Sequence, residues 1–161
     1  MKKKLKLVGD ILVYAFIAVI IAVFVMYAMG IKPYITMSGS MEPSIHTGSV
    51  CFVNTKADYD DIEAGDVIAF RIYTGKLVTH RAIAVTDTGI ETKGDNNDVS
   101  DGISTTTANF SGKTLFSIPY LGYAMKYLQQ PAGKIIIAVI VIAIIAMTIV
   151  DVFVERKETS A

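Results

Sequence analysis

Two long apolar runs frame this 161-residue chain, and a more polar segment of short strand-like stretches lies between them. Residues 11–31 and residues 135–150 contain no Asp, Glu, Lys or Arg. A helix rises about 1.5 Å per residue, so the first run covers about 31 Å, roughly the thickness of the hydrocarbon core of a bilayer. The second run is rich in Ile and Val but is too long for an ordinary strand. The pattern predicts one membrane-spanning helix at each end of the chain.

The first run has a second interpretation, as the apolar part of a cleaved signal peptide. Such peptides have apolar regions of about 7–15 residues, and the run in this chain is longer. A retained anchor is therefore expected over residues 8–31, and a second membrane helix over residues 134–154. These boundaries leave a domain over residues 32–133 and a short tail over residues 155–161.

The segment between the runs alternates short apolar, β-branched stretches with Gly-containing turns. Consecutive strands joined by such short turns form antiparallel hairpins. A polar loop rich in Asp, Asn, Ser and Thr interrupts them over residues 94–112. We therefore expect a mostly β domain, a small antiparallel barrel or sheet, with one transmembrane helix at each end. The strands are expected at residues 49–53, 66–73, 77–86, 89–93 and 113–118.

Basic residues near the start of the chain indicate how it is oriented across a membrane. Lys2, Lys3, Lys4 and Lys6 precede the first run, and Lys and Arg are enriched on the cytoplasmic side of membranes. We expect both termini in the cytoplasm, so that the chain is a multi-pass protein of the cell membrane with an extracytoplasmic domain. The tyrosines before the second run fit either an interfacial aromatic belt or half-buried packing, and they are Tyr120, Tyr123 and Tyr127.

Composition excludes several classes of protein. Charged residues make up 19% of the chain, below the roughly 25% of soluble domains, which argues against an ordinary soluble globular protein. The domain over residues 32–133 carries eight basic and eleven acidic residues, so it offers no basic face for nucleic acid. The single Cys51 is expected to be a small core residue, and His46 to be solvated. Because there are only two His and one Cys, we expect no metal or other cofactor.

Three polar clusters contain the residue types of a serine hydrolase. They are S-G-S-M-E-P at residues 38–43, T-H-R at residues 79–81 and G-D-N-N-D-V-S-D at residues 94–101. A serine hydroxyl becomes a good nucleophile when a base removes its proton, and histidine does this near neutral pH. A carboxylate on the other ring nitrogen fixes the tautomer and stabilises the imidazolium. By composition alone the combination is a weak signal, because most domains contain Ser, His and Asp.

The order and wording of these clusters resemble the boxes of the signal peptidase I family. The boxes are S-G-S-M-E-P, G-D-V-I-A-F, H-R-A-I-A-V and G-D-N-N-D-V-S-D, followed by I-P-Y-L-G at residues 118–122. Bacterial-type members have Lys before the Arg of the third box, whereas this chain has His80 before Arg81. The chain is therefore similar to the endoplasmic-reticulum type, in the form of a prokaryotic member with two membrane spans.

The resemblance implies a role for each matching residue. Ser40, directly before Met41, matches the nucleophile. Ser38 matches a position that helps to form the oxyanion hole together with the backbone N–H of the nucleophile. His80 matches the general base, and Lys76, four residues earlier, is the alternative base to test.

The acid of the site is left open among three carboxylates of the fourth box. Asp101 matches the triad acid, and Asp95 matches a second acidic position that the family needs. Asp98 competes with both. We expect Asp101 to orient His80, with Asp95 as the second choice and Asp98 as the third.

The resemblance implies a membrane-bound serine endopeptidase that removes N-terminal signal peptides from secretory preproteins, after small residues at positions −1 and −3. Its partners would be those preproteins and the lipid bilayer, and a need for accessory subunits is left open. The alternative is a catalytically inactive, membrane-tethered binding or assembly module on the same fold. If His80 is the base, activity should rise with pH through about 6–7, where histidine side chains lose their proton.

The length of chain before the serine keeps it near the bilayer. Nine peptide steps from Ile31 to Ser40 reach about 30 Å at most. The apolar helix of a signal peptide, about 7–15 residues long, spans only about 10–22 Å, so its cleavage site lies at or below the interface. We therefore expect the enzyme to cleave after short apolar helices and to spare spans of about 20 residues.

Overall fold

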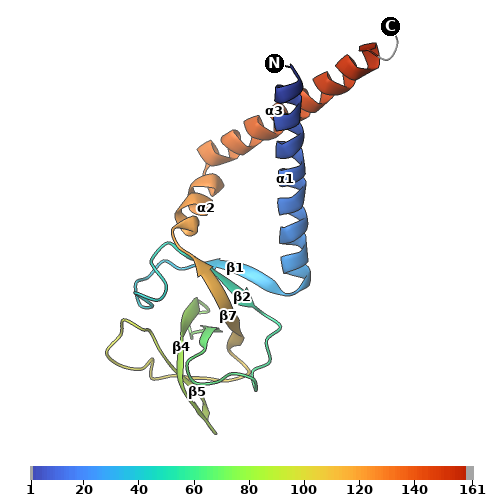
Figure 1. Ribbon diagram of the computed structural model, residues 1–161. Helices are drawn as coiled ribbons and strands as arrows, with labels where there is room; N and C mark the ends of the chain where they lie inside the picture. The colour runs from blue at the N-terminus through green and yellow to red at the C-terminus, as the bar shows by residue number, and fades with distance from the viewer. Residues whose placement is uncertain (1, 159–161) are drawn as a thin grey trace. The chain divides into compact units, whose positions relative to one another are not determined.

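Helices occupy both ends of the chain and strands the middle in the computed structural model, which describes residues 2–158 (Figure 1). The Lys cluster at residues 2–6 and the tail predicted over residues 155–161 lie outside the residues whose side chains are described. The chain divides into two units. One is helical and comprises the chain up to residue 25 and from residue 125 onward, and the other is the strand-rich unit of residues 26–124.

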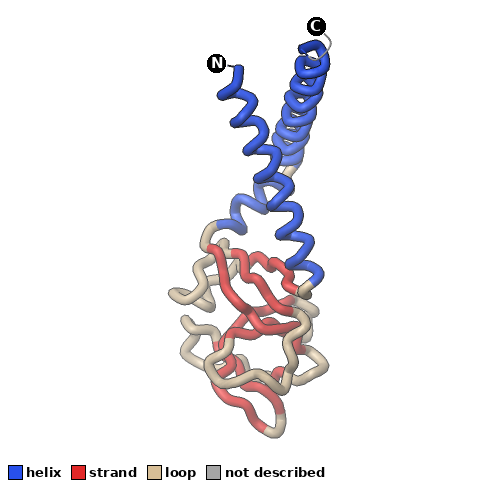
Figure 2. The backbone as a smooth tube through the Cα atoms, turned by 45° about the vertical axis from the view of Figure 1, so that its right-hand side comes forward, coloured by secondary structure: helices blue, strands red, loops and turns tan. Residues whose placement is uncertain are grey.

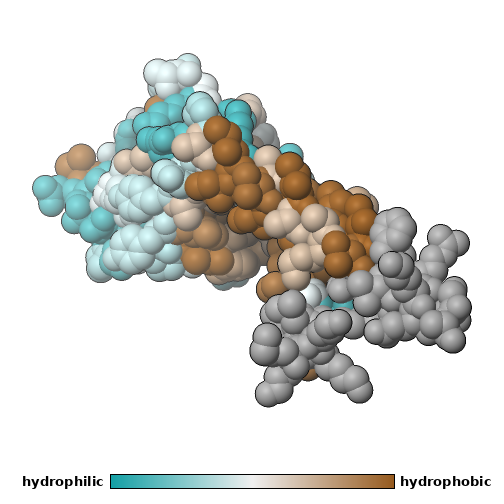
Figure 3. All heavy atoms as spheres, turned by 90° about the horizontal axis from the view of Figure 1, so that it is seen from above, coloured by the Kyte–Doolittle hydropathy of each residue, from teal (hydrophilic) through white to brown (hydrophobic). Residues whose placement is uncertain are grey.

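Two long helices carry the apolar runs. α1 (Lys2–Ala28) and α3 (Pro131–Glu158) each contain a 20-residue stretch that is long and apolar enough to cross a membrane, Gly9–Ala28 and Pro131–Val150. Nearly all side chains of both stretches are exposed, so neither helix has one buried face of the kind that packs a helix onto a soluble core. Figure 3 colours this apolar surface brown, whereas the visible surface of the strand-rich unit is mostly teal and white.

α1 ends before the apolar run does. Gly30 adopts a φ of +84°, a left-handed conformation that commonly follows a helix, and its N–H donates to the Tyr27 carbonyl. The Lys56 ammonium group donates to the Ala28 carbonyl at 2.8 Å and so satisfies one of the free acceptors at the helix end. The last residue of the run, Ile31, therefore belongs to the first strand rather than to the helix.

The strands form one open antiparallel sheet in the order β1-β2-β7-β3-β4-β5-β6, drawn in red in Figure 2. Their bounds are β1 (Ile31–Ile35), β2 (Val50–Asn54), β3 (Val67–Arg71), β4 (Leu77–Thr86), β5 (Gly89–Lys93), β6 (Ser104–Thr105) and β7 (Phe110–Ile118). Hairpins join β3 to β4 and β4 to β5, while β7 returns to lie between β2 and β3. The predicted fold class, mostly antiparallel β with an apolar helix at each end, is confirmed.

The core covers both faces of the sheet around β3. Successive side chains of a strand point to opposite faces, and on β3 Ile68 and Phe70 enter one cluster while Ala69 enters the other. All three are buried. The neighbouring strand β4 therefore pairs with a buried strand. One cluster contains Met41, Ile45, Cys51, Val53 and Ala69, and the other Ile62, Ile68, Phe70, Ala82 and Ile90.

The sequence pattern did not predict β1, β6 or the short helix α2 (Leu121–Gln129). β1 begins with Ile31, the last residue of the apolar run, and contains Pro33, which is unusual in strands. β6 has only two residues. In α2 the Tyr123 ring packs over Gly48, whereas Tyr120 and Tyr127 are more than half exposed. The three rings are thus about half exposed or more, and Tyr123 makes a close packing contact.

Candidate active site

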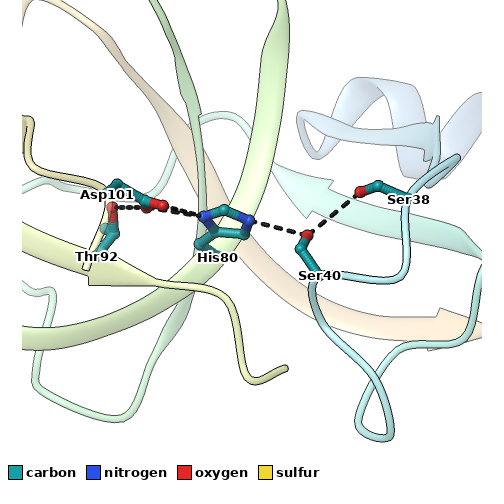
Figure 4. A network of polar contacts seen from close by, with 5 residues as sticks. All are labelled: Ser38, Ser40, His80, Thr92 and Asp101. Carbon is teal, nitrogen blue, oxygen red and sulfur yellow. Dashed lines mark hydrogen bonds and ion pairs between the residues drawn. The ribbon is translucent and has the colours of Figure 1, made fainter. Parts of the chain in front are cut away.

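A serine and a histidine from distant segments meet in a hydrogen bond. Ser40 lies in the turn-rich loop between β1 and β2, and His80 lies in β4. The Ser40 Oγ and the His80 Nε2 are 2.9 Å apart (Figure 4). Ser40 is partly exposed, whereas His80 is buried and packs edge-on against the Phe70 ring. The serine hydroxyl is thus within reach of solvent on one side and of a base on the other.

Core packing fixes the position of the serine. Met41, the next residue in the chain, is fully buried and packs with Ile45 in the core. The Glu42 N–H donates to the Gly39 carbonyl, and the Ile45 N–H donates to the Met41 carbonyl. These bonds close two consecutive turns, so Ser40 is held at the start of a compact loop.

Further contacts tie this loop to itself and to the loop after β5. The Glu42 carboxylate accepts hydrogen bonds from the Thr47 N–H at 3.2 Å and from the Thr47 hydroxyl at 2.9 Å, which together hold the pKa of Glu42 below its usual range. The Asn96 N–H donates to the Ser40 carbonyl at 2.9 Å. A Cβ added at Gly94 would lie 2.5 Å from that carbonyl oxygen, so a glycine is required for the two loops to approach.

An aspartate from the second of these loops completes the arrangement. The His80 Nδ1 lies 2.7 Å from the Asp101 Oδ2 and 2.9 Å from the Oδ1. An ionised carboxylate only accepts hydrogen bonds, so Nδ1 carries the proton and Nε2 presents its lone pair to Ser40. The Asp101 Oδ2 also accepts a bond from the Thr92 hydroxyl at 2.6 Å. The order hydroxyl, imidazole, carboxylate is that of a nucleophile, its base and the group that orients the base.

The residue after the histidine makes a different pair on the opposite face of β4. Arg81 donates from Nε to the Asp95 Oδ1 at 2.7 Å and from Nη2 to the Oδ2 at 2.6 Å. Its Nη1 donates to the Gly65 carbonyl at 2.7 Å, and its Nη2 lies 3.4 Å from the Ser44 hydroxyl. The guanidinium therefore connects β4 to three separate loops. Adjacent strand residues point to opposite faces, so the side chains of Arg81 and His80 leave β4 in opposite directions.

The three candidate acids are thus separated by their contacts. Asp101 contacts His80, whereas the carboxylate of Asp95 pairs with Arg81, and Asp98 is exposed. The hydrogen bonds from Arg81 hold the pKa of Asp95 below its usual range, and the same bonds raise the pKa of Arg81. The geometry favours Asp101 as the partner of the histidine, as the first choice from the sequence had it.

The remaining sequence candidates lie around the serine or outside the site. The Ser38 hydroxyl is exposed and lies 3.2 Å from the Ser40 Oγ. Lys76 is exposed in the turn before β4, and among the described residues it has no hydrogen bond to Ser40. His46 is partly buried and stacks on Tyr120, with ring centroids 6.1 Å apart.

Cys51 lies in the core, as predicted. It is fully buried, and burial raises the pKa of its thiol. Among the residues that the structure describes, no three His, Cys, Asp or Glu side chains are arranged to hold a metal ion.

Comparison with known proteins places the chain in a family. The model of the family described as signal peptidase, peptidase S26, matches residues 9–109, which include the serine, the histidine and the aspartate. The chain belongs to the peptidase S26 signal peptidase family. The family resemblance predicted from the sequence boxes is therefore confirmed.

Two relatives illustrate the breadth of this family. Signal peptidase I W of Bacillus subtilis is 38% identical over 88 residues, which cover 52% of this chain and 46% of that protein. The signal peptidase complex catalytic subunit SEC11C of Homo sapiens is 38% identical over 73 residues, which cover 42% of this chain and 38% of that protein. The chain thus matches less than half the length of either relative.

Sequence reasoning missed two features of the site. Thr92 was assigned only to a strand, and the pairing of Arg81 with Asp95 was not predicted. Arg81 and Asp95 stand in the third and fourth sequence boxes, but the sequence does not show that Arg81 is partly buried, which is what makes a bidentate carboxylate partner favourable. No comparable signal marks Thr92, because threonine is common in strands for its shape alone.

Proposed function

We propose that the chain is a membrane-bound serine endopeptidase, a signal peptidase I, that removes N-terminal signal peptides from secretory preproteins after small residues at positions −1 and −3. The observation that carries the proposal is the contact of the Ser40 Oγ with the His80 Nε2 at 2.9 Å, with Asp101 on the other ring nitrogen. The family and the names of its relatives support peptidase activity on signal peptides.

The proposed reaction is acyl transfer with Ser40 as nucleophile. The His80 Nε2 takes the hydroxyl proton while the Ser40 Oγ bonds to the carbonyl carbon of the scissile peptide. The C–N bond of the resulting tetrahedral intermediate then breaks, and the imidazolium gives its proton to the departing amine of the mature protein. Water, deprotonated by His80 in turn, hydrolyses the acyl ester and frees the signal peptide.

Asp101 and Ser38 have supporting roles in this proposal. Asp101 accepts the Nδ1–H bond, which keeps the neutral imidazole in the tautomer that faces Ser40 and stabilises the imidazolium formed on proton transfer. The Ser38 hydroxyl, exposed beside the nucleophile, donates to the oxyanion together with a backbone N–H. Asp95 acts at a distance, by holding Arg81 and the loops bound to it.

The location follows from α1 and α3. Both helices cross the cell membrane in this proposal, with the termini in the cytoplasm and the strand-rich unit on the outer side. β1 begins at Ile31, three residues after α1 ends at Ala28, so little chain separates the anchor from the sheet. This short connection keeps Ser40 close to the membrane surface, where the cleavage site of a short signal peptide lies.

The decisive experiment places the full chain in lipid vesicles with a labelled secretory preprotein. The wild type should release the signal peptide, and both Ser40→Ala and His80→Ala should abolish the release. Ser104→Ala is the matched control, because Ser104 is an exposed serine of the edge strand β6. Undiminished processing by Ser40→Ala would instead support an inactive binding or assembly module. Vesicles that contain only this chain also test whether accessory subunits are needed.

A further inference from the structure

A buried threonine holds the proposed acid at two points. Thr92 lies in β5 and is fully buried. Its hydroxyl donates to the Asp101 Oδ2 at 2.6 Å, and its carbonyl accepts the Asp101 N–H at 2.9 Å (Figure 4). Side chain and backbone of one strand residue thus fix both the backbone and the carboxylate of the aspartate.

We propose that Thr92 is a positioning residue of the proposed peptidase reaction, which sets the orientation of the Asp101 carboxylate through its hydroxyl group. The inference rests on the function proposed above. It concerns a residue that touches neither Ser40 nor the substrate and acts only through Asp101 and His80.

The aspartate needs such support because of where it lies. Asp101 lies within the irregular segment between β5 and β6, so no helix or strand of its own sets its side chain. The terminal torsion of an aspartate is broad, with no sharply preferred angle. Both carboxylate oxygens lie within 2.9 Å of the His80 Nδ1. The orientation of the imidazole therefore depends on where the carboxylate group lies, and a carboxylate that is free to rotate would hold the ring less well.

The geometry of the threonine bond supplies this constraint. The oxygen that accepts from Thr92, Oδ2, is also the oxygen closest to the His80 Nδ1 at 2.7 Å. A bond from a neutral donor to a carboxylate is stronger than one between neutral groups and is strongly directional. The Thr92 side chain is fully buried, so its neighbours restrict the rotamers that it can adopt. The carboxylate is therefore held between a buried donor and the base.

Packing alone is the competing explanation, since Thr92 also fills space opposite Ala82 on β4. Two substitutions separate the hydroxyl from the shape. Thr92→Val keeps the volume and the β-branch and removes the donor, whereas Thr92→Ser keeps the donor and removes a methyl group. A role in positioning predicts that the first lowers the rate and the second lowers mainly the stability.

The experiment measures cleavage of a labelled preprotein by each full-length variant in vesicles, together with its melting temperature. Thr92→Val should lower kcat by about tenfold with unchanged KM. Thr92→Ser should stay within about twofold of the wild-type kcat. Wild-type kcat in Thr92→Val, or an equal loss in both variants, would overturn the proposal.

A second pair of variants keeps the test decisive if Thr92→Val does not fold. Thr92→Ala and Thr92→Ser both lack the methyl group and differ only by the hydroxyl, so a lower kcat in the alanine variant supports the proposal and equal values overturn it. Failure of the function itself is distinguishable, because Ser40→Ala would then process the preprotein as well as the wild type does.

Discussion

Two neighbouring residues of β4 make the same kind of contact on opposite faces of the sheet, with different chemical consequences. His80 and Arg81 each face a carboxylate from the segment that follows β5, Asp101 in one case and Asp95 in the other. An imidazole gains and loses its proton near neutral pH, whereas a guanidinium keeps its charge under all ordinary conditions. The pair of His80 and Asp101 is therefore suited to proton transfer, and the pair of Arg81 and Asp95 is suited to stabilising the fold.

The two pairs also differ in what lies beyond them. His80 reaches the hydroxyl of Ser40, which is partly open to solvent. Arg81 instead contacts Ser44, four residues further along the same loop, and the carbonyl of Gly65. The loop that carries the proposed nucleophile is thus contacted by two adjacent residues of β4. His80 contacts the reactive serine, and Arg81 contacts Ser44 and so supports the loop.

The largest expected effect comes from removing the charge on the side of His80. Asp101→Asn should lower kcat by roughly a thousandfold or more, because an amide does not hold the imidazole in the tautomer that faces Ser40. The melting temperature should change little. Cleavage kinetics and thermal unfolding in the same vesicles or micelles measure the two effects. Asp98→Asn, which alters an exposed carboxylate of the same loop, is the control and should change neither.

A smaller effect, on stability and not on kcat, is expected on the side of Arg81. Asp95→Asn should lower the free energy of unfolding by about 1–2 kcal/mol, because it removes a bidentate ion pair that is only partly exposed. The folded protein should keep most of its kcat. Thermal unfolding and kinetics measured on one preparation test the separation. If Asp101→Asn and Asp95→Asn lower kcat and the free energy of unfolding in the same proportion, the contrast between the two faces is wrong.

The smallest effect is in the acid dependence of stability. The pKa of Asp95 is lowered in the folded chain by its bonds to Arg81, so the pair contributes fully above the unfolded-state pKa of about 3.9. That contribution is lost as the pH falls through the lowered folded-state pKa. The stability difference between wild type and Asp95→Asn should therefore be constant near neutrality and shrink below about pH 4. Melting temperatures from pH 7 to pH 3 measure it.

Local signals explain how much of the fold could be predicted. The predicted strands at residues 77–86 and 89–93 coincide with β4 and β5. A turn that contains Gly75 precedes β4, and a two-residue turn separates β4 from β5, so the sequence marks these strand ends. β1 was hidden because it begins at Ile31, the last residue of the apolar run, and only Gly30 and Lys56 mark the end of the helix. Those signals are a backbone conformation and a contact 28 residues apart in sequence, which no periodicity contains.

The site shows the same limit. The boxes single out Ser40 and His80, and the family match covers both. The choice among the acids depended on an irregular segment, in which the spacing of Asp95 and Asp101 does not determine the face of β4 that each one reaches. The role of Thr92 was not predicted at all, because it depends on the burial of that side chain and on its hydrogen bond to the Asp101 Oδ2.

The alternation of His80 and Arg81 along β4 has a consequence for how this protein can change. The pairing of Ile68 with His80 and of Val67 with Arg81 depends on the length of the turn between β3 and β4. A change of one residue in the length of this turn would shift the register and turn both side chains to the other face of the sheet, so that His80 no longer faces the serine. Point substitutions can therefore adjust this site by degrees, during evolution or in a designed library, but a one-residue insertion in the hairpin would abolish it in a single step.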